Sequence, residues 1–301
     1  MHSISYYLHN PNSLAIRLLE RYFTWLPDKM FLKIRFRLSM GYWLNLKNPQ
    51  TFSEKIQWLK LYNRKPEFTM MVDKVKVKSY IASIIGEKYI IPTLGVWDNP
   101  DEINFDVLPN RFVLKCNHNS GTGMYICKDK SKMDIEKVKA ELRKGLKQNY
   151  YKKNREWSYK NVEPRIIAEK YMEDKNGELK DYKFFCFDGC VKCLEVDYDR
   201  FIEHHRNIYD INWNLMPFSI AYPSKEGIVI EKPQNFEKMV EIAQILSKGC
   251  PHVRVDLYNI EGTIYFGELT FYHGSGYETF KPSEWNLKFG EWIQLPNKKI
   301  Y

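Results

Sequence analysis

The sequence has no continuous apolar run of about 18 residues, the length that a membrane-spanning helix requires. Near its start it has no apolar stretch of about 7–15 residues followed by small residues, so we expect no secretory signal peptide. Its six cysteines match no spacing of a secreted disulfide framework, which predicts reduced thiols. These absences favour a cytoplasmic protein.

Several catalytic and binding signatures are also missing. The sequence contains no Walker P-loop, no dinucleotide-binding glycine fingerprint and no nucleophile elbow. It shows no internal repeat and no pattern of a known nucleic-acid-binding module, so we expect no nucleic-acid partner. The net charge of +9 is spread along the chain, and nucleotide phosphates or an acidic substrate explain it more simply.

What the chain does contain is ample material for a folded core. Of its 301 residues, 44% are hydrophobic and 15% aromatic, which excludes a disordered chain. This length suits one large domain or two to three lobes.

Periodic apolar residues predict helices through residues 11–64, with Pro27 ending the first and Thr51 or Ser53 capping the third. We interpret them as a helical lobe packed on the rest of the chain. Because they are basic and rich in aromatics, peripheral contact with an anionic membrane is the alternative.

The middle of the chain alternates helices and short strands. Residues 70–86 read as one helix that ends near Gly86, and residues 149–163 read as a polar loop. Further strands and one further helix are predicted at 89–97, 111–116, 124–128, 133–148 (the helix) and 165–171.

Two hairpins are predicted in the last third. Asp188-Gly189 joins strands 181–187 and 191–197, and such a dipeptide is the strongest short hairpin signal. After a helix at 236–249, the turn 259–262 joins strands 252–258 and 263–270.

The second of these hairpins carries a cation and two carboxylates. Pairing its strands brings Asp256 close across the ladder from Glu268, while Arg254 shares a face with Asp256. Magnesium prefers such oxygen ligands, usually one or two carboxylates together with substrate phosphates. A structural pair between the arginine and a carboxylate is the alternative interpretation.

A glycine-containing loop follows Lys115. Glycines let backbone amides approach anions closely, so this loop is a candidate cover for phosphates. An ordinary hairpin loop explains the same letters.

In this order and spacing, the chain resembles the TupA-like ATP-grasp family, which occurs in bacterial gene sets for teichuronopeptide, capsule and other surface polysaccharides. The resemblance spans about residues 26–290. Its segments are NLKNPQTFSEKIQWLKLYNR, DKVKVKSYI, FVLKCNHNSGTGMYICKD, IIAEKYMED, DYKFFCFDG, VRVDLY and FGELTFYHGSG. It implies an α+β ATP-grasp fold, with a helical N-terminal lobe at 1–70, a small lobe at 71–168 and a large lobe at 169–301.

A more distant likeness to D-alanine–D-alanine ligases implies roles for single residues. ATP would be held by residues of both lobes: Lys74, Lys115, the loop Ser120, Gly121, Thr122 and Gly123, the hinge Glu169, Lys170 and Tyr171, and Asp181 at the ribose. Magnesium would be held by Asp256 and Glu268. Lys115 and Arg254 would also stabilise the reacting states.

Two departures from the family pattern stand out. Thr270 occupies the place of the usual third metal ligand, an asparagine, and a hydroxyl is a weaker ligand. The N-terminal lobe is also shorter than in typical members, so the identity of the carboxylate substrate does not carry over.

Other residues have two interpretations each. Lys183 is a candidate phosphate ligand or a solvated strand lysine, and Arg206, beside His204 and His205, is a candidate substrate ligand or part of a surface turn. His273 and Ser275 line a substrate pocket or a plain turn. Cys186, Cys190 and Cys193 lack a second C-x-x-C pair, so we expect small buried apolar residues.

The resemblance implies an ATP- and Mg²⁺-dependent carboxylate–amine ligase that acts through an acyl phosphate. Its partners would be an acidic sugar or polysaccharide precursor and an amino acid. Two rivals stay open: a glycosyltransferase, for which Asp197-Tyr-Asp199 has the spelling of a metal motif, and a non-catalytic scaffold, which the Thr270 departure favours.

Overall fold

The computed structural model describes residues 10–175, 177, 179–198, 205–225, 227–228 and 230–297. Within these residues, no helix combines the length and the apolar composition needed to cross a membrane.

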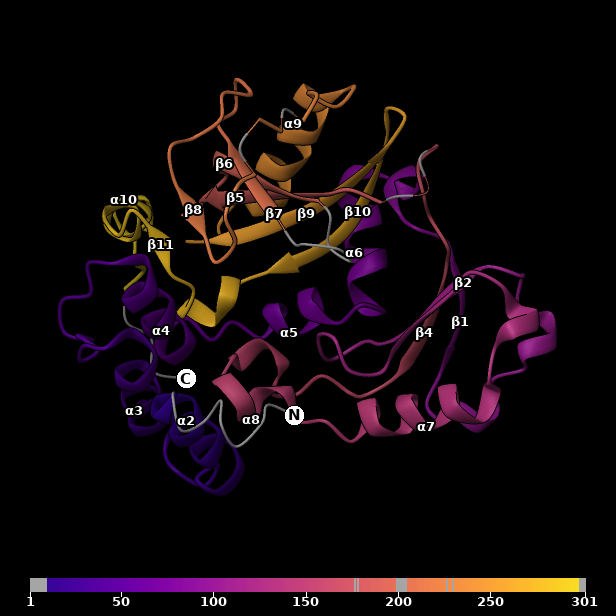
Figure 1. Cartoon of the computed structure of the whole chain (residues 1–301), viewed down its shortest axis with the longest axis horizontal. Coiled ribbons are helices and arrows are strands. Elements are labelled where there is room, and N and C mark those ends of the chain that lie inside the picture. Colours follow the sequence, from indigo (N-terminus) through magenta and orange to yellow (C-terminus); the bar gives the residue numbers. More distant parts are fainter. Residues whose placement is uncertain are drawn as a thin grey trace.

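Two antiparallel sheets and a short third one organise the chain (Figure 1). The small sheet has the strand order β1-β4-β2-β3, with β1 at Thr93–Trp97, β2 at Phe112–Cys116, β3 at Met124–Cys127 and β4 at Ile166–Lys170. The large sheet has the order β10-β9-β5-β6-β7, with β5 at Asp181–Phe187, β6 at Cys190–Tyr198, β7 at His205–Tyr209, β9 at Val253–Ile260 and β10 at Thr263–Thr270. The third sheet pairs β8 at Ser219–Ile220 with β11 at Phe280–Lys281.

Helices surround these sheets, so the predicted α+β class is confirmed. Their bounds are Pro11–Tyr22 (α2), Asp28–Met40 (α3), Phe52–Tyr62 (α4), Glu67–Val72 (α5), Lys76–Ile85 (α6), Ile135–Leu146 (α7), Tyr150–Asn154 (α8), Phe236–Ser247 (α9) and Glu284–Trp292 (α10).

The large sheet is apolar on one face and charged on the other. Along β9, Val253, Val255 and Leu257 are buried in the same core as α9. Arg254 and Asp256 alternate with them and therefore point to the opposite face. This charged face is where the predicted site residues gather.

The small sheet is covered by α7, which contacts β2 and β3 and whose buried residues share an apolar core with the sheet. Both predicted hairpins of the large sheet are present. At the first, Asp188 and Gly189 have φ of 47° and 80°, as the predicted tight turn requires.

The N-terminal helices join the rest of the molecule through α4. Its N-cap is Thr51, whose side chain accepts from the Glu54 amide while the Glu54 carboxylate accepts from the Thr51 amide, so the predicted cap is confirmed. Lys55 Nζ donates to the carbonyl oxygens of Gly290 (2.8 Å) and Ile293 (2.9 Å), which ties α4 to the C-terminal helix α10. The lobe boundaries near residues 70 and 168 stay a prediction.

Three expectations about local structure are wrong. Residues 70–86 form two helices, α5 and α6, separated at Asp73–Val75. The supposed loop 149–163 contains α8 and a 3₁₀ turn at Trp157–Tyr159, and several of its side chains are buried. Arg206 lies in β7 rather than in a loop, because it pairs with Asp197 across the β6–β7 ladder.

Candidate functional site

Asp256 and Glu268 lie opposite each other because β10 contains a bulge. Phe266 pairs with Leu257, a register that would place Gly267 opposite Asp256. The register shifts after Phe266, so that Glu268 pairs with Asp256 instead. Since side chains alternate along a strand, this one-residue shift turns Glu268 to the charged face.

Arg254 connects the groups on this face. Its Nε donates to Asp256 Oδ1 at 2.7 Å and its Nη2 to Asp256 Oδ2 at 2.6 Å, which makes a bidentate pair. Nη2 also donates to Glu268 Oε1 (3.2 Å) and Thr270 Oγ1 (3.3 Å), while Nη1 lies 2.7 Å from His273 Nδ1. One guanidinium thus holds two carboxylates, a hydroxyl and an imidazole in fixed positions.

The oxygen donors fit a magnesium ion that is completed by substrate. Burial raises the pKa of Asp256 to about 7 against the opposing effect of Arg254. Burial also raises the pKa of Glu268, but the charges of Lys74 and Arg254 outweigh it and the pKa is lowered. Among the described residues, no three His, Cys, Asp or Glu side chains form a metal-binding group. Asp256, Glu268 and the Thr270 hydroxyl would therefore hold Mg²⁺ together with nucleotide phosphates.

Lys74 faces this site from the break between α5 and α6. Asp73 Oδ1 accepts from the Val75 amide (2.9 Å) and from Asn117 Nδ2 (2.9 Å), which fixes the break. Lys74 Nζ donates to the carbonyl oxygen of Asn119 at 2.6 Å, beside the glycine loop. Burial lowers the pKa of Lys74, and the charge of Glu268 opposes this effect. The two side chains therefore interact electrostatically across the site.

Lys115 and Lys78 share one carboxylate. Lys115 Nζ lies 2.5 Å from Glu169 Oε2, and Lys78 Nζ lies 2.6 Å from Glu169 Oε1. Burial opposes ionisation of Glu169, but the two ammonium groups lower its pKa. The structure thus brings the predicted residues Lys115 and Glu169 together and adds Lys78.

The glycine loop is anchored at its start and exposed at its tip. Of the loop Asn117–Gly123, the first three residues are buried, and Asn119 Nδ2 donates to the carbonyl oxygen of Gly145 at 3.1 Å. Gly123 has a φ of 72°, and a Cβ there would lie 2.9 Å from Gly145 Cα in α7. The part left to cover phosphates is therefore residues 120–122.

A cavity of about 690 Å³ is lined by residues of both the small sheet and the large sheet. One wall comes from the small sheet and is partly apolar, and the other comes from the segment after β4 and from β5, β6 and β9. It is lined by Ile91, Val113, Lys115, Met124, Ile126, Lys128, Glu169, Lys170, Tyr171, Met172, Gly177, Leu179, Lys180, Asp181, Asp197, Tyr198 and Tyr258. Five predicted nucleotide-binding residues line it: Lys115, Glu169, Lys170, Tyr171 and Asp181.

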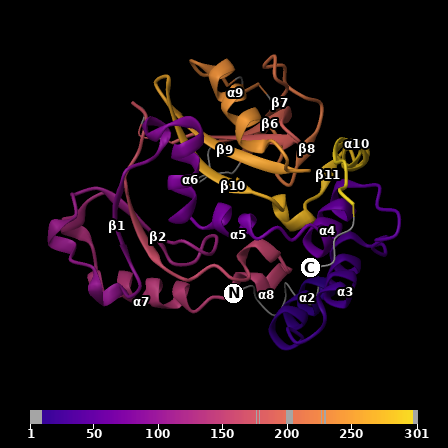
Figure 2. The ribbon, with the colours of Figure 1, turned by 180° about the vertical axis from the view of Figure 1, so that it is seen from behind.

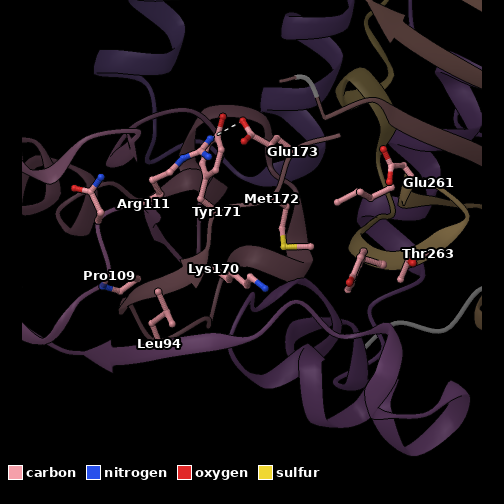
Figure 3. Close-up of a pocket in the computed structure, with 12 residues that line it drawn as sticks. Leu94, Pro109, Arg111, Lys170, Tyr171, Met172, Glu173, Glu261 and Thr263 are labelled. Atoms are coloured by element: carbon pink, nitrogen blue, oxygen red, sulfur yellow. Dashed lines mark ion pairs between the residues drawn. The ribbon is translucent and has the colours of Figure 1, made fainter. Parts of the chain in front are cut away.

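A second hollow, of about 810 Å³, shares Lys170, Tyr171 and Met172 of the hinge with this cavity (Figure 3). Its other lining residues are Glu173 and residues of β1, of the loop before β2 and of the hairpin of β9 and β10. Arg111 pairs with Glu173 at 2.5 Å, and its guanidinium carbon lies 4.3 Å from the centre of the Tyr171 ring. The Tyr171 side chain is thus engaged with Arg111.

Lys183 and Arg206 are internal counterions, so the solvated-lysine and surface-turn interpretations are wrong. Lys183 pairs with Asp197 and lies 3.8 Å from Glu195. Arg206 Nε donates to Asp197 Oδ1 at 2.7 Å, and its Nη1 lies 3.3 Å from Glu195 Oε2. Burial opposes ionisation of Asp197, yet these two cations lower its pKa well below the usual range. His204 and Asp199 lie outside the described residues.

His273 and Ser275 occupy a tight turn, His273–Gly276, directly after β10. Ser275 Oγ donates to Glu156 Oε1 at 2.7 Å and accepts from Lys60 Nζ at 2.9 Å. His273 Nε2 lies 2.8 Å from Glu278 Oε2. The turn is therefore built into a buried polar network beside Arg254.

Some residues around the site were not predicted from the sequence. Lys60 and Lys78 lie on helices predicted only as packing elements, and Glu156 lies in the supposed loop. Burial, and then the charges of Glu156 and Glu268, raise the pKa of Tyr150 and Tyr159, so this segment lies beside the charged face of the large sheet. The alternation of aromatic and charged residues in YYKKNREWSYK was the available signal. Cys190 is also exposed, contrary to the prediction for the three cysteines.

Comparison with known families decides the classification. The TupA-like ATP-grasp family matches residues 54–294. The chain belongs to this family. The TupA-like ATP-grasp match covers both sheets, the hinge and every predicted site residue from Lys74 to Ser275, and the predicted fold is confirmed. A search of curated proteins found no match.

Solved structures resemble the chain more distantly. D-Alanine–D-alanine ligase from Helicobacter pylori is 15% identical, with a TM-score of 0.43 over 82% of this chain and 70% of that one. The Bacillus anthracis D-alanine–D-alanine ligase, complexed with ATP, is 18% identical, with a TM-score of 0.44. That match covers 74% of this chain and 63% of that one. The ATP-grasp ligase PsnB, complexed with a phosphomimetic variant of its minimal precursor, Mg and ADP, is 12% identical, with a TM-score of 0.41, 90% of this chain and 68% of that one. This chain thus spans less than two thirds of the B. anthracis enzyme.

Proposed function

We propose that this chain is an ATP- and Mg²⁺-dependent carboxylate–amine ligase. One observation carries the proposal. One cavity of about 690 Å³ joins Lys115 of the small sheet to Asp181 of the large sheet, and Lys74, which donates to the glycine loop at Asn119, lowers the pKa of Glu268 by its charge. Cations suited to polyphosphate and oxygen ligands suited to Mg²⁺ therefore face each other, as phosphoryl transfer from ATP requires.

The nucleotide would enter the cavity of about 690 Å³. Met124 and Ile126 are exposed apolar side chains on its small-sheet wall, and they suit a flat base. Asp181 on the opposite wall would accept from ribose hydroxyls. The triphosphate would run past Lys115 toward Lys74 and under residues 120–122, whose backbone amides are free to approach anions.

The chemistry would proceed in two displacements. An oxygen of the substrate carboxylate attacks the γ-phosphorus of ATP, and the bond from this phosphorus to the bridging oxygen breaks. ADP departs with the bonding electrons, and the product is an acyl phosphate. The nitrogen of an amine then attacks the carbonyl carbon, phosphate leaves with the bonding electrons, and the amine loses a proton to give an amide. Arg254 would stabilise the developing oxyanion. Bound Mg²⁺ would neutralise phosphate charge.

The substrate side would be the turn with His273 and Ser275, which follows the metal-binding strand directly. Arg206 lies deeper and would support the charged layer, because Asp197 already binds its guanidinium. The family resemblance and the net charge of +9 support an acidic sugar of a surface polysaccharide as the carboxylate and an amino acid as the amine. A mutant strain whose polysaccharide kept its full amide content would contradict this assignment.

The glycosyltransferase alternative has less support. Its metal motif would need the Asp197 carboxylate, which is buried between Lys183 and Arg206. The scaffold alternative keeps the Thr270 departure as its argument.

The test measures ADP and phosphate released from Mg-ATP by the purified chain, with amino acids screened against uronic-acid acceptors. We expect turnover that needs both substrates and falls by about 100-fold or more in Asp256→Asn. Asp98→Asn is the matched control, because Asp98 is an exposed carboxylate that pairs at the surface with Arg165 at 3.2 Å. Absence of turnover with every pair, together with no Mg-ATP binding in calorimetry, would rule the ligase out.

A further inference from the structure

Helix α2 carries apolar side chains on two neighbouring faces, one buried and one exposed. Leu19 faces inward and is buried in a small core with Leu26 and Phe31. Leu14, Leu18 and Tyr22 recur at every fourth position and are exposed. A surface helix usually turns its apolar stripe toward the core, so packing in this core does not account for the exposed stripe.

The outer stripe continues into the turn between α2 and α3. Trp25 is 72% exposed and Tyr22 57% exposed, and Phe23 and Met30 are exposed as well. The rings of Phe23 and Trp25 lie 6.4 Å apart, centre to centre. Large aromatic side chains therefore gather at one protruding turn.

Positive charge surrounds the same turn. The first 50 residues contain seven Lys and Arg and two Asp and Glu, so they hold +5 of the total net charge of +9. Both acidic residues are used internally: Glu20 pairs with Arg35 at 3.2 Å, and Asp28 pairs with Arg64 at 2.6 Å. Among residues 10–50, the exposed cations without an ion pair are Arg21, Lys29, Lys33, Arg37 and Lys47.

We infer that the tip of α2 and α3, made of Leu18, Arg21, Tyr22, Phe23, Trp25 and Lys29, docks on an anionic lipid surface. Tyr and Trp rings favour the interface between water and hydrocarbon, and unpaired Lys and Arg nearby are attracted to anionic headgroups. The tip lies at a corner of the molecule beside α8 in both views, away from the small sheet that forms one wall of the nucleotide cavity (Figures 1 and 2). Docking there leaves the cavity open.

The experiment is sedimentation of the full chain with vesicles, in the absence of ATP, so that its outcome is independent of the proposed reaction. Vesicles of phosphatidylcholine alone are compared with vesicles that also contain phosphatidylglycerol. We expect binding to the anionic vesicles only, weakening at about 1 M salt as the charges are screened. Arg21→Gln with Lys29→Gln should weaken it roughly 30-fold, and Tyr22→Ser with Trp25→Ser about tenfold at either salt concentration.

Matched controls separate docking from general charge or apolar exposure. Lys132→Gln with Lys144→Gln removes two exposed cations elsewhere, and Val107→Ser with Leu215→Ser removes two exposed apolar side chains elsewhere. Both controls should bind as the wild type does. No binding to anionic vesicles, or an equal loss in the controls, would overturn the inference. A third result would also overturn it: a wild-type dimer that binds no vesicles and that dissociates in the variant Tyr22→Ser with Trp25→Ser. The tip would then be a subunit interface.

Discussion

Lys60 is a buried lysine that holds the turn His273–Gly276 in place. Its Nζ donates to Ser275 through the carbonyl oxygen at 2.8 Å and the hydroxyl at 2.9 Å, and to Gln57 Oε1 at 3.0 Å. Burial lowers the pKa of Lys60 to about 7, and the Glu156 carboxylate opposes this effect. Burial raises the pKa of Glu156, which Lys60 opposes in turn.

The low pKa of Lys60 predicts how stability depends on pH. An unfolded lysine keeps its proton up to about pH 10, so above about pH 7 the unfolded chain binds more protons at this position than the folded chain. The contribution of Lys60 to the free energy of unfolding therefore increases with pH, by at most about 1.4 kcal/mol per pH unit. Lys60→Met lacks this contribution. In this variant Glu156 also loses its neighbouring cation, so the pKa of Glu156 rises further. Both effects make the wild type more stable relative to Lys60→Met as the pH rises.

Urea unfolding at several values from about pH 7 to about pH 9 measures this difference. We expect the wild type to gain stability relative to Lys60→Met as the pH rises. Lys144→Met, which changes an exposed lysine, should run parallel to the wild type. Parallel profiles for Lys60→Met would show that Lys60 keeps an ordinary pKa.

At the scale of elements, the sequence predicted where helices and strands occur better than where they are interrupted by a bulge or a break. Both hairpins of the large sheet were predictable, because turn residues separate alternating apolar strands. The bulge at Gly267 was not, since the hairpin tip alone sets a register in which Gly267 faces Asp256. The break at Asp73 also escaped, because its partner Asn117 is distant in sequence. Both interruptions position site residues, and both depend on contacts that no local pattern encodes.

The contact between α7 and the glycine loop yields a prediction at this scale. Alanine normally favours a helix over glycine by about 1 kcal/mol. At Gly145, however, a Cβ would lie 2.7 Å from Gly123 Cα and 2.7 Å from Cys116 Sγ, so backbone must move. Gly145→Ala should destabilise the protein by about 1–3 kcal/mol and weaken Mg-ATP binding, because the loop is displaced.

Thermal unfolding and calorimetry with Mg-ATP measure the two effects of Gly145→Ala. Lys144→Ala, on the same helix and exposed, is the control and should change neither quantity appreciably. A more stable Gly145→Ala variant with unchanged nucleotide affinity would mean that α7 accommodates the methyl group and that the loop does not depend on it.

At the scale of the whole molecule, the family pattern predicted which residues meet but not how the lobes join. Lys115, Glu169 and Asp181 line one cavity as predicted, because the order of strands along the chain determines it. The predicted N-terminal lobe shares its core with the large sheet: Phe52, Ile56 and other residues of α4 belong to the same apolar cluster as β9. Apolar spacing along one helix does not reveal that partner, since any apolar surface satisfies it.

A ligand that bridges the two sheets should stabilise the whole chain. At a concentration of about 100 times its Kd, Mg-ATP should raise the free energy of unfolding by about 2.7 kcal/mol and the Tm by several degrees. The magnesium part of this shift should vanish in Asp256→Asn, so that ATP with Mg²⁺ and ATP with chelator give equal Tm values. Asp98→Asn should keep the full difference between the two conditions. If Asp256→Asn retained the full magnesium effect, Asp256 would not be a required ligand of the ion, because a single carboxylate can hold Mg²⁺ together with phosphates.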